Sequence, residues 1–183
     1  EDVRGRGIWL GNLGLVYDDL KQPEKAIELH NKSIEIARKL FDKRGLISRL
    51  TNIGNTHLAK GDIPAALTCF HEITAIALEL NDYKELAVRL GMIGSLEVKL
   101  ARNTTNPTIQ RKHYASAIDH YAKTLTIVRQ LHDPATEGTL LRSIGDTLVE
   151  LGRYNQAVEY YFSARQLFLT LGMTEEAEES KRS

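Results

Sequence analysis

The sequence predicts an all-α fold built from helical hairpins in tandem, and two observations carry that prediction. The first is that a small set of residues recurs in register along the 183 residues. A glycine that follows an aliphatic residue recurs in steps of 40, 40 and 51, and an alanine that precedes one recurs in steps of 40, 51 and 40. Because glycine makes up roughly 7% of average sequences, four glycines in register indicate an internal repeat. These positions are Gly14, Gly54, Gly94 and Gly145, with Ala26, Ala66, Ala117 and Ala157.

The second observation is the spacing of apolar residues inside each repeat. In the first repeat Leu10, Leu13 and Tyr17 fall on one stripe, and Ala26 and Ile34 fall on a second. Spacings of three and four residues are typical of helices, and the alternation expected of strands is absent. We therefore expect two helices per repeat. They span about 3–20, 23–40, 43–60, 63–80, 83–101, 107–131, 134–151 and 154–171, and a ninth begins near Thr174.

Prolines and short polar residues place the starts of several helices. Each proline lies near a predicted helix start, where a missing N–H group costs little. Asp62, Asn106 and Asp133 stand at or just before such starts and are predicted N-caps. The connections are mostly about two residues long, so consecutive helices should form antiparallel hairpins. The prolines are Pro23, Pro64, Pro107 and Pro134.

The predicted organisation is a single array over residues 1–183. Eleven extra residues near 102–113 interrupt the third repeat, and we expect them to form a short loop and about two added helical turns that protrude at one edge. Such an insertion is either functional or simply a tolerated surface feature. Because the first unit opens at the second residue, we also expect a fragment of a longer array. The units span about 2–41, 42–81, 82–132 and 133–172, and residues 173–183 start another helix.

The recurrent glycine is predicted to be a packing position. A glycine inside a helix costs up to about 1 kcal/mol relative to alanine, so four of them in register imply a compensating gain. We expect each glycine to lie where the two helices of a hairpin cross, opposite the small alanine of the same repeat. Gly14 would then face Ala26.

These residues resemble the tetratricopeptide repeat (TPR). The resemblance implies a right-handed α-solenoid of four TPR hairpins plus the start of a ninth, capping or truncated, helix. The period of 40 exceeds the roughly 34 residues of the standard repeat and is similar to long repeats in kinesin light chains, G-protein-linked spindle adaptors and bacterial multidomain regulators. Glu97 and Leu148 depart from the pattern, because they replace its usual tyrosine. The pattern is carried by Leu10, Leu13-Gly14, Tyr17, Ala26 and His30, then by Ile53-Gly54, Ala66 and Phe70, by Ile93-Gly94, Ala117 and Tyr121, and by Ile144-Gly145, Ala157 and Tyr161.

Composition and charge narrow the classes of function. Twenty-four basic side chains balance 24 acidic ones, so bulk charge does not favour nucleic-acid binding. The longest apolar runs fall far short of the roughly 18 residues that cross a membrane. The single cysteine, Cys69, suits a reducing, intracellular setting. We therefore expect a cytoplasmic protein that binds neither nucleic acid nor membrane.

None of the catalytic or metal-binding patterns in the sequence is complete. His71-Glu72 begins like a zinc-protease helix, but Ala75 stands where the second histidine is needed. A phosphate-binding glycine loop and a nucleophile elbow are both absent from the sequence. The prediction is a protein without enzymatic activity, metal or cofactor.

A TPR array offers a concave groove lined by the first helix of each repeat. The resemblance implies that Asn12 and Asn52 grip the backbone of an extended peptide, a task that suits an amide because it both donates and accepts hydrogen bonds. The alternative is a structural hydrogen bond to a neighbouring helix. The groove candidates are Asn12, Asn52, Asn55, Ser95, Lys99, Arg142 and Asp146.

The predicted function is protein–protein interaction. The chain would act as a scaffold or adaptor that binds a peptide or helix of a partner protein, as a fragment of a larger protein. The alternative is a sensor or regulatory arm of a larger signal-transduction ATPase or transcription regulator. We also expect that an array open at both ends can self-associate by end-to-end stacking.

Overall fold

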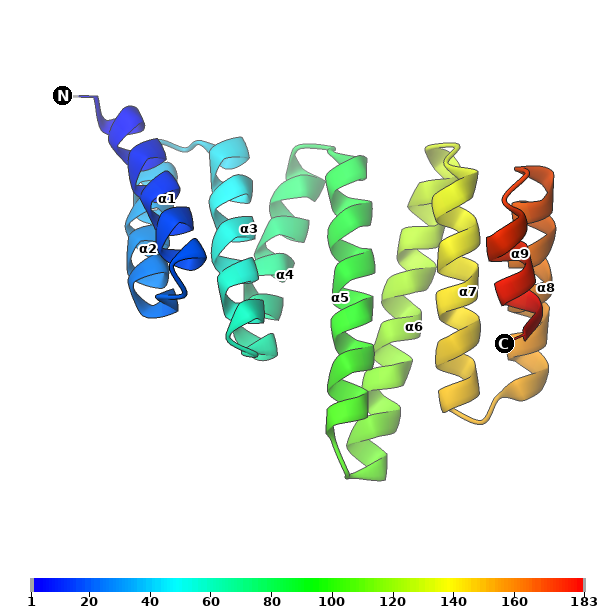
Figure 1. Cartoon of the computed structure of the whole chain (residues 1–183). Helices are drawn as coiled ribbons and strands as arrows, with labels where there is room; N and C mark the ends of the chain where they lie inside the picture. The colour runs from blue at the N-terminus through cyan, green and yellow to red at the C-terminus, as the bar shows by residue number, and fades with distance from the viewer. Residues whose placement is uncertain (1, 183) are drawn as a thin grey trace. The chain divides into compact units, whose positions relative to one another are not determined.

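A computed structural model describes residues 2–182, and the environments of side chains as far as Ser180. Within that range the chain forms nine α-helices and no β-strand (Figure 1). The nine predicted helices are confirmed, and their ends differ from the predicted ones by at most two residues. Residues 1 and 183, the limits of the predicted array, lie outside the described residues.

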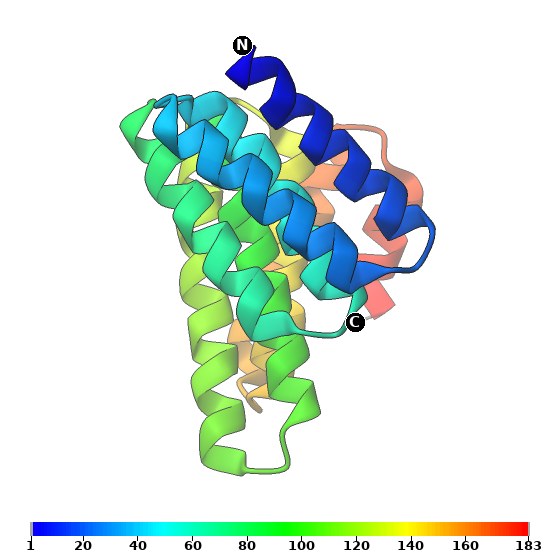
Figure 2. The same cartoon turned by 90° about the vertical axis from the view of Figure 1, so that its left-hand side faces the viewer.

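The chain divides into two compact units, Glu1–Asp82 and Tyr83–Ser183, and the division falls at the predicted start of the third repeat. In the first unit α2 (Pro23–Lys39) packs on α3 (Lys43–Ala59), and α1 (Val3–Asp19) makes a smaller contact with α3. Figure 2 shows α1 and α2 side by side along their lengths. The hairpins of this unit are α1 (Val3–Asp19) with α2 (Pro23–Lys39), and α3 (Lys43–Ala59) with α4 (Ile63–Glu79).

The second unit repeats this arrangement and adds a short ninth helix. Its core joins Tyr121, Ile144, Tyr161 and Phe168 in one buried cluster. Helix α7 (Pro134–Glu150) packs on α6 (Pro107–Gln130), and α9 (Thr174–Arg182) packs on α8 (Tyr154–Thr170). Helices α7 and α9 thus each cover the hairpin that precedes them. The helices are α5 (Tyr83–Asn103), α6 (Pro107–Gln130), α7 (Pro134–Glu150), α8 (Tyr154–Thr170) and α9 (Thr174–Arg182).

The insertion lengthens both helices of the α5/α6 hairpin. These helices have 21 and 24 residues, whereas α7 and α8 have 17 each, and Figure 1 shows the long hairpin extending beyond α7 and α8. The predicted protruding extension is therefore confirmed. Glu97, which replaces the tyrosine of the TPR pattern, lies 2.6 Å (Oε2 to Nδ1) from His113 in the added part of α6. The inserted turns thus supply the partner that this half-buried carboxylate needs.

Aspartates and asparagines begin most of the helices, as predicted. Asp62, Asn106 and Asp133 each accept a backbone N–H bond from the first turn of the following helix. Asp2 and Asp42 do the same at the starts of α1 and α3, with distances of 2.8 and 2.9 Å, although the sequence had not identified them as caps. Each turn between helices, except the loop between α5 and α6, contains one residue with positive φ. It is glycine at positions 61, 152 and 172, and otherwise it is Lys21, Phe41, Asn81 or His132.

The predicted partner of the recurrent glycine is wrong. A β-carbon built on Gly14 would lie 2.5 Å from the ring of His30, and not against Ala26. The three later glycines meet the ring of Phe70, Tyr121 or Tyr161 at 2.7 Å. The helices therefore cross with the aromatic residue, four positions after the alanine, directly over the glycine. Close approach remains the reason for glycine, but a ring rather than a backbone fills the space.

Candidate functional site

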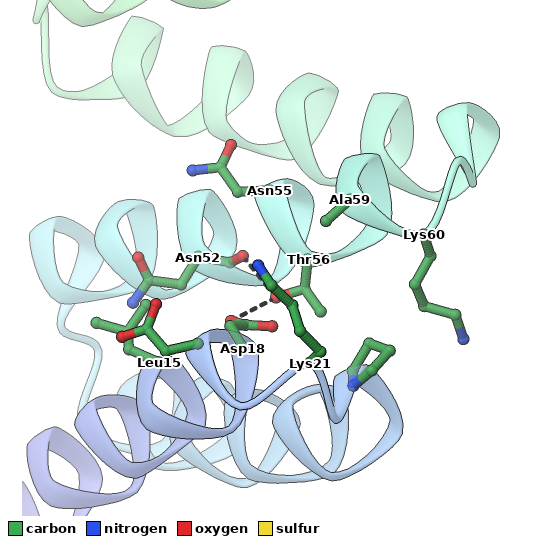
Figure 3. Close-up of a pocket in the computed structure, with 10 residues that line it drawn as sticks. Leu15, Asp18, Lys21, Asn52, Asn55, Thr56, Ala59 and Lys60 are labelled. Atoms are coloured by element: carbon green, nitrogen blue, oxygen red, sulfur yellow. Dashed lines mark hydrogen bonds between the residues drawn. The ribbon is translucent and has the colours of Figure 1, made fainter.

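The first unit holds a cavity of about 410 Å³ between α1 and α3, here called the α1–α3 cavity (Figure 3). Two of the predicted groove residues, Asn52 and Asn55, line it. Leu15 and Asp19 of α1 line it from the other side. The remaining lining residues are Asp18, Lys21, Pro23, Thr56, Ala59 and Lys60.

Asn52 and Asn55 lie three residues apart on α3, so both reach the same side of that helix. Asn52 is half-buried and Asn55 is exposed, and neither side chain makes a hydrogen bond to another described residue. A structural bond to a neighbouring helix, the alternative that the sequence left open for Asn12 and Asn52, is therefore not what holds Asn52. The donors and acceptors of both amides are available to a molecule in the cavity.

A hydrogen-bonded group fixes the wall beneath these amides. Thr56 Oγ1 donates to Asp18 Oδ2 at 2.8 Å, which joins α3 to α1 (Figure 3). The same carboxylate oxygen lies 3.1 Å from Nε2 of His30, a fully buried residue of α2. Because one carboxylate serves both partners, the relative positions of three helices are tied together. Contacts within the protein therefore set the position of this wall.

Charged side chains of both signs stand at the edge of the cavity. Lys60 lies 3.2 Å from Glu24, in an exposed ion pair. Lys21 occupies the positive-φ turn before α2, and Asp19 is exposed at the end of α1. The mixture matches the neutral net charge of the chain and gives the cavity no single-sign preference.

The predicted groove residues of the second unit are mostly engaged inside that unit. Ser95 Oγ lies 3.1 Å from the hydroxyl of Tyr121, and the hydroxyl of Tyr161 donates to Asp146 at 2.8 Å. Arg142 pairs with Glu179 of α9. Lys99 is exposed, and Asn12 is exposed on α1 without lining the α1–α3 cavity.

One register position explains this difference between the units. Asn55, Ser95 and Asp146 each follow the recurrent glycine, so each lies beside the aromatic residue that covers that glycine. In the third and fourth repeats the aromatic residue is a tyrosine, whose hydroxyl binds the neighbour. In the second repeat it is Phe70, which has no hydroxyl, and Asn55 keeps its hydrogen-bonding groups free. Burial raises the pKa of Tyr121 and of Tyr161, which keeps both phenols neutral.

The second unit has its own cavity, of about 550 Å³, between α5, α6 and α7. Its walls are mainly apolar and include Val88, Val128 and Leu140. The four groove candidates of this unit line no part of it. Of the groove candidates, Asn52 and Asn55 therefore line a cavity, whereas the four in the second unit do not.

Several cavity residues were missed by sequence reasoning. Asp18 and Thr56 are 38 residues apart, so no local pattern connects them. A signal was nevertheless present, because His30 occupies an aromatic core position and a buried imidazole requires a polar partner.

Neither a metal-binding cluster nor a membrane-spanning helix is found among the described residues. They contain no group of three or more histidine, cysteine, aspartate or glutamate side chains able to hold a metal ion. Among them, too, no helix has both the length and the apolar character needed to cross a bilayer. Burial raises the pKa of the Cys69 thiol, which lowers its reactivity as a nucleophile.

Family models match both units of the chain. One model of the tetratricopeptide repeat matches residues 5–79, and a second matches residues 143–161. The chain is a tetratricopeptide-repeat protein. The helices described above and the solved structures that resemble them give it the all-α TPR solenoid fold.

Similar proteins come from distant sources. The chain is 29% identical to human G-protein-signaling modulator 1, over 86% of this chain and 25% of that protein. A signal transduction ATPase with numerous domains from Pyrococcus horikoshii, which has a TPR sensor, is similar with a TM-score of 0.78 and 19% identity, over 98% of this chain and 26% of that one. A Rap protein complexed with competence and sporulation factor has a TM-score of 0.67 and 16% identity, over 98% and 47% of the two chains. The TPR chain spans only 12% and 25% of the length of the curated relatives it matches.

Proposed function

We propose that this TPR protein is a protein-interaction module whose first unit holds an extended segment of a partner protein in the α1–α3 cavity. The observation that carries this proposal is the pair of amides, Asn52 and Asn55, which stand on one wall of the cavity and bind no other described side chain. The similar Rap protein, solved with competence and sporulation factor bound, supports a partner of the protein or peptide class.

The spacing of the two amides suits a peptide backbone. Three residues of helix rise about 4.5 Å, and successive residues of an extended peptide advance about 3.3 Å. Asn52 and Asn55 can therefore bind peptide groups one or two residues apart, each donating to a carbonyl and accepting from an N–H group. Leu15 and Ala59 offer apolar contact to the side chain between them.

Charged residues on the wall opposite the two amides determine which charged groups of a bound segment the site can pair with. Lys21 and Asp19 stand near the same edge of the cavity and can pair with charges of either sign on the bound segment. The Asp18–Thr56 bond keeps this wall in place, so little ordering of the protein is required on binding. The module performs no chemistry in this proposal.

The test uses peptides selected from a random phage-displayed library on the wild-type protein. The double variant Asn52→Ala/Asn55→Ala should weaken their binding at least about tenfold, because each amide loses its hydrogen bonds to the peptide backbone, worth about 1 kcal/mol each. Asn31→Ala, which removes an exposed amide of α2 outside the cavity, is the matched control and should leave the affinity unchanged. Selected peptides that bind the folded double variant as tightly as the wild type would refute the site.

A regulatory role within a larger ATPase is the second candidate, and the similarity to the archaeal ATPase with a TPR sensor favours it. In that role the bound segment would be the signal that the sensor reports. The same double variant separates the two, because in a parent protein with ATPase activity it should abolish the response of hydrolysis to the peptide. A peptide response that persists without the amides would contradict this second role.

A further inference from the structure

The protruding end of the α5/α6 hairpin carries positive charge only. From residue 98 to residue 118 the chain has no aspartate or glutamate, although the whole sequence has 24 acidic and 24 basic side chains. The rest of the chain therefore has 20 basic and 24 acidic side chains, so the two signs are segregated in a protein of zero net charge. The basic side chains of this segment are Lys99, Arg102, Arg111 and Lys112, here called the basic tip.

The ends of the other hairpins carry both signs of charge. At each of these turns an acidic and a basic side chain lie within three positions of each other in the sequence. The charge of the long hairpin is therefore a property of its added turns and is not shared by the repeat. The residues at the other turns are Asp19 and Lys21 for α1/α2, Lys60 and Asp62 for α3/α4, and Glu150 and Arg153 for α7/α8.

Three cations of the basic tip have no partner among the described residues. Lys99, Arg111 and Lys112 are exposed, and none of them forms an ion pair or a side-chain hydrogen bond with another described residue. Arg102 differs, because its Nε and Nη2 atoms donate to Glu150 Oε1 at 3.2 and 2.9 Å. That contact joins the extended end of α5 to the end of α7. It leaves three cations able to attract an anionic group outside the protein.

The tip is held in place by its own hydrogen bonds and is accessible. Figure 1 shows the α5/α6 hairpin extending beyond α7 and α8. Asn106 accepts the backbone N–H group of Ile109 at 3.2 Å, and Gln110 Nε2 donates to the carbonyl of Ala101 at 3.2 Å. Ile109 stands three positions before Lys112 on α6 and is 45% exposed, so it offers apolar contact beside the cations.

The number of free cations favours a short acidic segment over an extended polyanion. Affinity for nucleic acid comes from the counterions released by many phosphate contacts. Basic clusters that bind anionic membranes contain roughly four to eight lysine or arginine side chains. Three free cations fall short of both, and the net negative charge of the rest of the chain opposes an extended anionic surface. A segment with two or three carboxylates matches the tip, and Arg111 can bind one of them through two parallel hydrogen bonds.

We infer that the basic tip is a docking surface for an acidic segment of a partner protein. Electrostatic attraction guides the segment to the tip, where Arg111 and Lys112 bind its carboxylates and Ile109 contacts an aliphatic group. Because these side chains are exposed, the binding is weak and depends strongly on salt. The surface belongs to the second unit and does not involve Asn52 or Asn55, so it is independent of the function proposed for the α1–α3 cavity.

The first test measures binding of a fluorescein-labelled hexaglutamate peptide by fluorescence anisotropy, with hexaglutamine as the neutral counterpart. Hexaglutamate should bind the wild type and hexaglutamine should not, and raising the salt from about 20 to about 200 mM should weaken binding at least about fivefold. Arg111→Glu/Lys112→Glu should weaken it at least about tenfold, because two attractive charges become repulsive. Lys39→Glu/Arg44→Glu is the matched control, since it reverses the same two residue types at exposed positions of the first unit without a described partner, and it should bind like the wild type.

The second test identifies the class of anion. Under the same conditions a hexathymidylate oligonucleotide and phosphatidylserine-containing vesicles should bind the wild type no more tightly than hexaglutamate. Tighter binding of either one, lost in Arg111→Glu/Lys112→Glu, would assign the tip to another class of partner and overturn the inference. Failure of hexaglutamate to bind, or equal losses in the two charge-reversed variants when circular dichroism shows both to be folded, would overturn it as well. Asn52→Ala/Asn55→Ala should bind hexaglutamate like the wild type, which keeps this test separate from that of the cavity.

Discussion

The ring of Tyr121 occupies the space in which Gly94 would carry a β-carbon. That carbon would lie 2.7 Å from Cε1 and 2.8 Å from Cδ1 of the tyrosine, closer than real β-carbons approach other atoms. Tyr121 is itself buried and bound to Ser95, so the ring has little room to move. The contact recurs in each repeat and fixes how the two helices of a hairpin cross.

This contact predicts opposite effects for two glycines of the same helix. Gly94→Ala should lower the free energy of unfolding by about 1–2 kcal/mol, because overpacking outweighs the helix-propensity gain of alanine. Gly91→Ala should raise it by up to about 1 kcal/mol, since its β-carbon would meet only Thr124, at 3.7 Å. Urea unfolding followed by circular dichroism measures both. Equal effects of the two substitutions would contradict the assigned contact.

The turn at Phe41 predicts a stabilising substitution. Phe41 has φ of 52° and is 90% exposed, so its ring gains little from the fold while its backbone adopts a conformation unfavourable to L-residues. Phe41→Gly should raise the free energy of unfolding by about 0.5–1 kcal/mol, because relief of roughly 1–2 kcal/mol of strain exceeds the added entropy of the unfolded chain. The melting temperature measures the gain.

The reverse substitution provides the control. Gly61 is the positive-φ residue of the turn between α3 and α4, with φ of 81°, and a β-carbon there would meet nothing within 4 Å. Gly61→Ala should therefore destabilise the protein by about 1 kcal/mol through the backbone alone. If both variants melted at the wild-type temperature, strain in these turns would not contribute to stability.

The shared carboxylate of Asp18 predicts that Asp18 contributes far more to the free energy of unfolding than the adjacent Asp19. Asp18→Ala would leave the buried groups of His30 and Thr56 without their shared acceptor, so the free energy of unfolding should fall by about 2 kcal/mol. Asp19→Ala, at the exposed neighbouring position, should change it by no more than about 0.5 kcal/mol. Chemical denaturation separates the two, and similar losses would show that the shared acceptor is not what matters.

The hydroxyl of Tyr161 predicts a loss of stability in alkali. Burial and the neighbouring charge of Asp146 raise the pKa of Tyr161, so the phenol ionises in the unfolded chain before it does so in the folded one. Its contribution is therefore complete below about pH 10 and is lost as the pH rises further. Tyr161→Phe should lower the free energy of unfolding by about 1 kcal/mol at neutral pH and reduce the alkaline loss.

Thermal melting at neutral and alkaline pH measures both effects of Tyr161→Phe. Tyr154→Phe removes a hydroxyl from an exposed ring of the same helix and should leave the neutral melting temperature unchanged. An alkaline loss that is identical in Tyr161→Phe and the wild type would assign the effect to other groups.

Helix positions could be read from the sequence because they depend on local signals. The spacing of apolar residues, the prolines and the capping aspartates each act within one or two turns. The partner of Gly14 could not be read in the same way, because it depends on how far one helix slides along another. Spacing alone showed that Gly14 and Ala26 face inward, and the slide that places His30 over the glycine appears only when both helices are packed.

The same distinction applies to the candidate site: positions on one helix could be read from the sequence, but contacts across a hairpin could not. Asn52 and Asn55 were found because their positions on α3 determine which way they face. Ser95 and Asp146 were assigned to the groove on the same grounds, but the hydroxyls of the tyrosines across the hairpin bind both. The relevant difference, tyrosine in two repeats and phenylalanine in one, was visible in the sequence, and its meaning required knowing which residues lie across from each other.

The contact between Glu97 and His113 makes the length of the α5/α6 hairpin and the residue at position 97 depend on each other. A shortened chain that lacks the inserted turns would leave Glu97, only 13% exposed, without the imidazole that it contacts. Restoring the usual tyrosine at that position would solve the problem for the shortened chain but would deprive His113 of its partner in the full-length hairpin. The two features therefore have to be exchanged together, so any design that trims this repeat to a length of 40 residues must change a side chain outside the deleted segment.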